Sequence, residues 1–172
     1  EGTIISKNPS NSSQKIVKSI IAIRNTALID VSGGGMVGAP GTAAKIFDAL
    51  ARKSVNIMMI SQSPSESSIS MVVKKDDLDT AITTLDLTLL DKVIKNVRVN
   101  EDVAVVAVVG SGMRGIKGIA AKVFSSVSKN SINVIMIAQG SSELNLAFVV
   151  NNVDCEKAVR SLHEAFMLTK VN

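Results

Sequence analysis

Two stretches of this sequence, GGGMVGAPGTAAKIF (33–47) and GSGMRGIKGIAAKVF (110–124), are copies of each other separated by 77 positions. The likeness extends without a gap over residues 16–85 and 93–162, and it includes loops as well as periodic segments. A duplication that keeps its loops indicates two copies of one site or of one interface.

Each copy carries the same order of predicted elements, in which a glycine loop separates a strand from a helix. In the first copy, Ala43, Phe47 and Leu50 recur at helical spacing after the loop at 33–41. The full prediction is strands at 17–24 and 27–32, a helix at 42–53, strands at 55–61 and 68–74, a helix at 76–87, strands at 94–100 and 103–109, a helix at 118–129, strands at 132–138 and 145–150, and a helix at 154–166.

Each unit therefore has the order β-α-β-β-α and needs one more strand. Residues 94–100 supply it for the first unit, whereas the second unit ends without one, and its repeat partner, 17–24, lies upstream. We predict a nested arrangement, with module one at 27–101 and module two split into 16–26 plus 102–172. The fold class is α+β: two ferredoxin-like βαββαβ modules, each a four-stranded antiparallel sheet with both helices on one face.

Composition narrows the classes of function. Hydrophobic residues make up 46% of the chain, which is typical of a globular protein, and aromatics only 2%. Base stacking on aromatics is the usual basis of single-strand binding, and the net charge of +4 includes no basic run, so we expect no nucleic-acid partner. No apolar stretch reaches the roughly 18 residues of a membrane span and there is no signal peptide, so we expect a cytoplasmic setting.

The sequence contains few residues suited to catalysis or to metal binding. Cys155 is the single cysteine and His163 the single histidine, so neither an internal disulfide nor a metal cluster can be built from them. No nucleophile with a nearby base and no pair of carboxylates stands out. We therefore expect no catalytic site and no metal or cofactor in this chain.

Both glycine loops match the dinucleotide pattern G-x-G-x-x-G. Three observations argue against that function. Gln62 and Gln139 stand where an acidic residue should hold the ribose. A hairpin follows in place of a second crossover helix, and two mononucleotide folds do not fit into repeats of this length. A phosphate-binding loop is excluded too, because no Gly-Lys-Ser/Thr follows either loop.

What remains is the general chemistry of a glycine-rich turn at a helix start. Exposed backbone amides and the positive end of the helix dipole favour a small carboxylate. Gln62 and Gln139 would add a neutral amide, and Asn56 and Asn133 begin the same strands. The alternative is structural: the glycines only make a tight connection, the asparagines form turns, and the glutamines are exposed strand ends.

At these residues the chain resembles the paired ACT domains in the C-terminal regulatory region of aspartate kinase. The stretches that carry the resemblance are GTIIS (2–6), VSGGGMVGAPGTAAKIFDALARKSVNIMMISQSPSESSISMVV (31–73) and VVGSGMRGIKGIAAKVFSSVSKNSINVIMIAQGSSELNLAFVVN (108–151). The threonine-responsive members are the most similar. Because the chain begins at Glu1, the resemblance implies that residues 1–15 are a linker from a kinase domain that uses ATP and magnesium.

The resemblance also implies an effector site and an assembly. Gly38, Ala39 and Gly41 would meet the effector's carboxylate or amine, Gln62 would contact its polar groups, and Asn133 with Val134 would close the site. Asn56, Gly115, Gly118 and Gln139 are the counterparts and form a possible second site. The modules would also mediate a homodimer.

Two positions depart from the family pattern. Several members carry an acidic residue in the loop where this chain has Gly38, and lysine-sensitive members carry one where this chain has Met58. A buried, unpaired lysine ammonium is costly, so threonine is the expected effector. The alternatives are a response to another amino acid such as lysine, a ligand-independent dimerisation module, and a nucleotide-binding enzyme.

Overall fold

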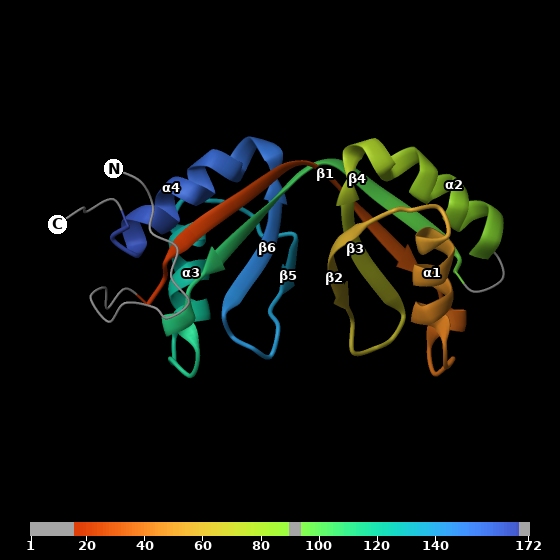
Figure 1. The fold of residues 1–172 in the computed structure, drawn as a ribbon, viewed down its shortest axis with the longest axis horizontal. Helices are drawn as coiled ribbons and strands as arrows, with labels where there is room; N and C mark the ends of the chain where they lie inside the picture. The colour runs from red at the N-terminus through yellow and green to blue at the C-terminus, as the bar shows by residue number, and fades with distance from the viewer. Residues whose placement is uncertain (1–15, 90–93, 169–172) are drawn as a thin grey trace.

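The computed structural model describes residues 16–89 and 94–168, so the predicted linker at 1–15 lies outside the described residues. One six-stranded antiparallel sheet, in the order β2-β3-β1-β4-β6-β5, carries two pairs of helices (Figure 1). The strands are β1 (Ser19–Ser32), β2 (Ile57–Gln62), β3 (Ser68–Lys74), β4 (Asn96–Val109), β5 (Met136–Ala138) and β6 (Asn145–Asn151). The helices are α1 (Thr42–Ala51), α2 (Leu78–Leu89), α3 (Ile119–Lys129) and α4 (Cys155–Ala165).

Short 3-10 turns precede each helix along the chain. They are η1 (Gly34–Met36), η2 (Lys75–Asp77), η3 (Ser111–Met113) and η4 (Asn152–Asp154). The predicted fold class is confirmed, since each half of the molecule has an antiparallel sheet with its helices on one face. Within the described ranges, no helix combines the length and apolar character needed to cross a membrane.

The two longest strands differ from the prediction. Residues 17–24 and 27–32, predicted as separate strands, belong to the single strand β1, and residues 94–100 and 103–109 belong to β4. The break that the sequence suggests survives as a shift in register between Ile23 and Thr26. There Asn25 adopts a left-handed φ of 58°, and the buried Thr26 hydroxyl donates to the Val103 carbonyl at 2.8 Å. The strand is therefore bent but continuous.

The pairing of β1 and β4 joins the two halves of the chain. The first half of β1 lies opposite the second half of β4, from Ser19↔Val109 to Ile23↔Val105. The second half of β1 lies between β3 and the first half of β4, so Ile29 is opposite both Met71 and Val99. The module boundaries at 27–101 and at 16–26 plus 102–172 stay a prediction.

Strand β5 is shorter than the predicted 132–138. The amides of Ser131 and Ile132 donate to the carbonyls of Ser128 and Val127 at the end of α3, at 2.8 and 3.4 Å. Because these amides are used by the end of the helix, ladder pairing with β6 starts only at Ile135 and Met136.

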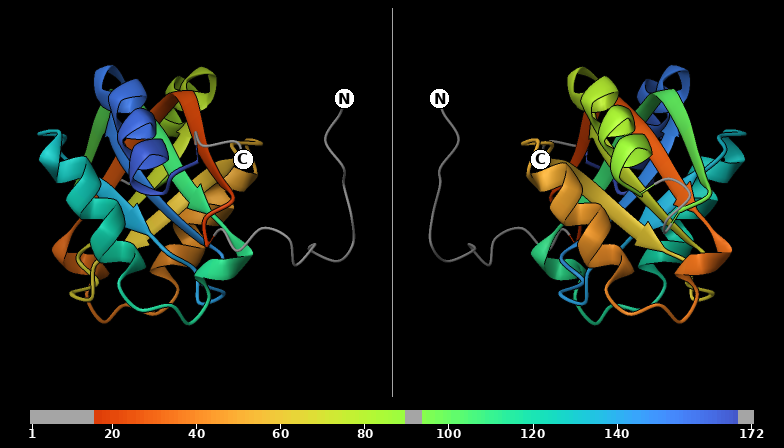
Figure 2. Two further views of the ribbon diagram at one scale, coloured as in Figure 1. Left: turned by 90° about the vertical axis from the view of Figure 1, so that its left-hand side faces the viewer. Right: turned by 90° about the vertical axis from the view of Figure 1, so that its right-hand side faces the viewer.

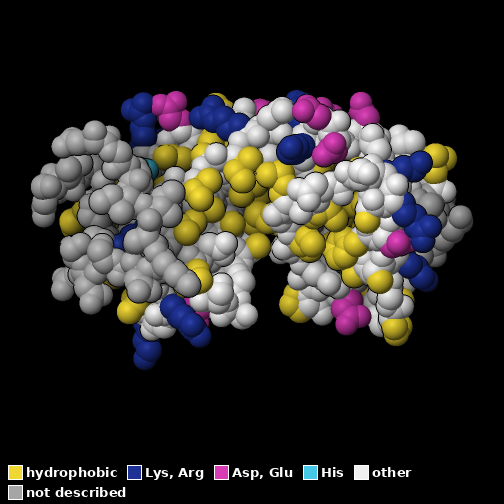
Figure 3. All heavy atoms as spheres, in the orientation of Figure 1, with side chains coloured by type: hydrophobic (Ala, Val, Ile, Leu, Met, Phe, Trp, Pro, Cys, Tyr) yellow, Lys and Arg dark blue, Asp and Glu magenta, His cyan; other side chains and the backbone are white. Residues whose placement is uncertain are grey.

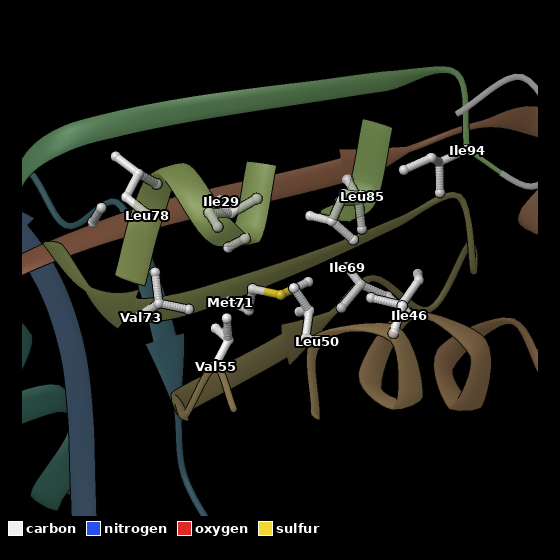
Figure 4. Packing of buried hydrophobic residues seen from close by; sticks show 14 of the residues in the cluster. Ile29, Ile46, Leu50, Val55, Ile69, Met71, Val73, Leu78, Leu85 and Ile94 are labelled. Carbon is white, nitrogen blue, oxygen red and sulfur yellow. The ribbon is translucent and has the colours of Figure 1, made fainter. Parts of the chain in front are cut away.

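Each helix pair packs on one half of the sheet and encloses its own core. Helices α3 and α4 lie side by side at one end of the molecule, and α1 and α2 at the other (Figure 2). In the first half, Ile46 and Leu50 of α1 and Leu85 of α2 meet Met71 of β3 (Figure 4). In the second half, Phe148 packs edge-to-face on Phe124, with ring centroids 5.8 Å apart.

A third apolar cluster joins the helix-free faces of the two halves. Alternation along β4 separates the clusters: Val106 faces the second core, whereas Val103 and Val105 face the third cluster. Met59 of β2 and Met136 of β5 bring the two sheet edges into this cluster. In the space-filling view, hydrophobic side chains gather across the middle of the face shown, above a notch between the halves (Figure 3).

The chain segment that leads into β1 crosses the second glycine loop. Val17 is buried in the second core, and the Lys18 amide donates to the Val109 carbonyl at 2.8 Å. A Cβ added at Gly110 would overlap the Ile16 carbonyl oxygen and lie 2.9 Å from the Val17 Cα. Gly110 has an extended φ of −178°, so this close approach, not its φ, requires glycine.

We therefore expect Gly110→Ala to lower the free energy of unfolding by about 1–3 kcal/mol, because a backbone segment must move to admit the methyl group. Chemical denaturation measures it. Gly34→Ala is the matched control, since a Cβ added at Gly34 would meet nothing within 4 Å and its repeat partner is Ser111. Equal stabilities of the two variants would contradict the packing explanation.

Candidate functional site

Each glycine loop forms a wall of a pocket at the start of the helix that follows it. The pocket at α1 has a volume of about 350 Å³, and the pocket at α3 about 590 Å³. We call them the α1 pocket and the α3 pocket. The first is lined by Met36, Gly38, Ala39, Pro40, Gly41, Thr42, Ala43, Gln62 and Glu66. The second is lined by Met113, Gly115, Ile116, Lys117, Gly118, Ile119, Ala120, Gln139, Gly140, Ser141 and Glu143.

The loop of the α1 pocket is anchored to the core and then turns outward. Met36 is buried in the first core, and its carbonyl accepts from the Ala39 amide at 3.2 Å. Gly38, between them, adopts a φ of 64°, a left-handed conformation that glycine enters without steric cost. The Thr42 hydroxyl then donates to the Ala39 carbonyl at 2.9 Å. These bonds hold the loop at the mouth of the pocket.

The helix starts that face the pockets have no side-chain cap. Gly41 is the N-cap of α1 and Gly118 the N-cap of α3, and neither position provides a capping side-chain bond. The first amides of an α-helix have no partner inside the helix and lie at the positive end of its dipole. Each pocket therefore presents backbone donors to a small anion.

A glutamate from the neighbouring hairpin completes each loop. The Gly38 amide donates to Glu66 Oε2 at 2.8 Å, and the Gly115 amide donates to Glu143 Oε2 at 2.6 Å. Glu66 lies in the turn between β2 and β3, and Glu143 in the turn between β5 and β6. A carboxylate thus stands beside the amide-rich helix start in both pockets.

The structure brings most of the predicted effector-binding residues together. Gly38, Ala39, Gly41 and Gln62 all line the α1 pocket. Gly115, Gly118 and Gln139 line the α3 pocket in the same relative positions. Their roles in binding stay predictions.

Three predicted residues lie elsewhere. Asn56 and Asn133 are exposed just before β2 and β5, and Val134 packs against the second core. None of the three is among the residues that line the two pockets. The closing contact of Asn133 and Val134 with an effector therefore stays a prediction.

Glu66 and Glu143 are pocket residues for which the sequence alone suggests no role. The available signal is their repetition, since a Ser-Glu pair follows each glutamine at the same offset. Both glutamates have a left-handed φ of 58°, which no sequence pattern reveals. The fold turns an exposed hairpin residue toward a loop that lies 28 positions away along the chain.

The two pockets differ in charge. Among the described residues that line the α1 pocket, Glu66 alone is charged, whereas the α3 pocket contains Lys117 as well as Glu143. Pro40 is the repeat partner of Lys117, so the loops are similar in course but not in chemistry. In the part of the chain that the structure describes, no cluster of three or more His, Cys, Asp or Glu residues is suited to hold a metal ion.

Comparison with known proteins agrees with this architecture. The family model of the ACT domain matches residues 29–88 and 106–166. Among curated proteins, the chain is 36% identical to bifunctional aspartokinase/homoserine dehydrogenase 2 of Zea mays and 35% identical to the bifunctional enzyme of Haemophilus influenzae. Each alignment covers 98% of this chain but only 19% and 21% of the relative, so the chain spans about a fifth of their length.

Solved structures extend the likeness to the whole regulatory unit. The ligand-free regulatory subunit of aspartate kinase from Thermus thermophilus is 31% identical, with a TM-score of 0.78. The match covers 88% of this chain and 99% of that subunit. Aspartokinase III of E. coli, solved in complex with lysine and aspartate, is 26% identical with a TM-score of 0.72, over 91% of this chain and 35% of that one. The chain therefore belongs to the ACT domain family, in the paired form found in the regulatory regions of aspartate kinases.

Proposed function

We propose that this chain binds a free α-amino acid, with threonine as the effector, and thereby regulates an aspartate kinase of which it is one part. The observation that carries the proposal is the repeated pocket, in which an uncapped helix start, a glutamine and a carboxylate converge. An α-amino acid carries both an anion and a cation within a few ångströms, which matches this set of groups. The kinase activity, with ATP and magnesium, would reside in another part of the protein.

Threonine fits the α1 pocket better than lysine does. Gln62 provides a neutral donor and acceptor for a hydroxyl group. Lysine brings a second ammonium, and Glu66 is the one carboxylate among the described lining residues. One cation of lysine would remain without a partner, which costs free energy if that cation is desolvated.

We further propose that a second copy of the chain completes the site. Asn133 and Val134 lie outside both pockets of their own chain, so they would contribute to a site only across an interface with a second copy. The outer strands β2 and β5 carry Ile60 and Ile137, which are 43% and 45% exposed. A homodimer would cover these side chains, and an effector would act through its different affinity for two states of the assembly. We keep the cytoplasmic setting as a proposal.

The same edge strands favour the second candidate function, a dimerisation module that needs no ligand. Unpaired strand edges with exposed isoleucines are suited to self-association. Sedimentation of the chain with and without threonine separates the two functions. A dimer whose stability is indifferent to every amino acid supports the second function.

For the first function, we expect isothermal titration to show saturable binding of threonine, and weaker binding of lysine, methionine and isoleucine. The physical reason is the neutral Gln62 and the single carboxylate of the α1 pocket. The absence of heat with all four amino acids would contradict the effector role.

We expect Gln62→Ala to weaken threonine binding by roughly threefold to tenfold, the usual effect of losing one net hydrogen bond. Gln139→Ala is the matched control at the corresponding position of the α3 pocket, and it should have the smaller effect. Titration of each variant measures both. Equal losses, or a larger loss in Gln139→Ala, would refute this ranking.

A further inference from the structure

The bond between Glu66 and Gly38 places a fixed negative charge in the α1 pocket. The loop at 33–41 contains no acidic side chain, so the loop itself provides no carboxylate for a ligand ammonium. The carboxylate of Glu66 lies within 2.8 Å of the Gly38 amide. The hairpin thus delivers a carboxylate to the loop position that lacks one.

The backbone of the hairpin is shaped for this contact. Glu66 adopts a φ of 58°, a left-handed conformation that non-glycine residues enter only at a steric cost. The Glu66 amide donates to the Ser63 carbonyl at 2.9 Å, which closes the turn. Glu143 has the same φ and a matching bond to Gly140, at 3.1 Å. Both copies of the hairpin therefore hold the glutamate in one strained conformation.

The bond to the loop leaves most of the carboxylate available. It uses Oε2 of Glu66, whereas an ionised carboxylate has about four acceptor positions. The other charged feature of the pocket is the positive end of α1 at Gly41. Between the positive end of α1 and the Glu66 carboxylate, a zwitterion has one favourable orientation. Its carboxylate lies at the helix start and its ammonium at Glu66.

We propose that Glu66 is the residue that selects for the ammonium group of the effector, with Glu143 in the same role in the α3 pocket. This inference rests on the proposed amino-acid function and adds to it the polarity of binding. It defines the ligand class as molecules with a free α-ammonium, which should bind more tightly than hydroxy acids that lack this group.

A purely structural role is the competing explanation, in which Glu66 only holds the loop closed. Glu66→Gln separates the two roles, because the amide oxygen can still accept from the Gly38 amide while the charge is lost. Glu66→Ala removes both. Hydrogen exchange of the Gly38 amide reports on the loop bond without any ligand.

The experiment compares threonine with 3-hydroxybutyrate, which has hydrogen in place of the ammonium. We expect Glu66→Gln to bind threonine roughly tenfold more weakly, as for the loss of a charge-assisted hydrogen bond. Its affinity for 3-hydroxybutyrate should not fall, and its Gly38 amide should exchange as slowly as in the unaltered chain. Glu66→Ala should accelerate that exchange. Glu66→Gln combined with Glu143→Gln should weaken threonine binding in both pockets.

The matched control is Asp79→Asn, which removes a negative charge on α2 outside both pockets and should leave threonine binding unchanged. Unchanged threonine affinity in Glu66→Gln overturns the inference, as does an equal loss for both ligands. If the unaltered chain binds no amino acid, the proposed function fails first, and the inference fails with it. If the unaltered chain binds threonine and only the Glu66→Gln result disagrees, the inference alone is wrong.

Discussion

The antiparallel pairing of β1 with β4 is the constraint on which the rest of the structure depends. Each strand has 14 residues. One half of each strand lies in the first half of the sheet, and its other half lies in the second half of the sheet. Neither sequence repeat has a full set of strands by itself, because the first repeat pairs with the first half of β4 and the second repeat with the first half of β1. The two cores and the cluster between them therefore pack on one continuous sheet, even though the sequence is a tandem repeat.

This shared sheet also explains why the two pockets are alike. The glycine loop leaves the end of a central strand, and the hairpin turn lies next to it because the strands are paired up to that end. The Gly33 amide donates to the Ser67 carbonyl at 3.0 Å, and the Gly110 amide to the Leu144 carbonyl at 2.9 Å. These bonds hold each loop beside its hairpin, within reach of Glu66 or Glu143.

The repeat nonetheless produces two sites with different chemistry. Proline and threonine in the first loop correspond to lysine and isoleucine in the second, at Pro40, Thr42, Lys117 and Ile119. The backbone course is retained because it depends on glycines and on paired strands. Side chains on the pocket rim carry no such constraint, so the two pockets can differ in ligand preference.

The sequence by itself determined the repeat, the order of elements, the fold class and the placing of Gly38, Gly41 and Gln62 around one site. These features follow from local periodicity and from loops at strand ends, which neighbouring residues specify. Only the tertiary structure decided that β1 and β4 are continuous, that β5 begins at Met136, and that Asn133 lies outside the pockets. It also decided that Glu66 reaches the loop. Such contacts join residues distant along the chain, and their geometry depends on the register and bend of strands that no local pattern records.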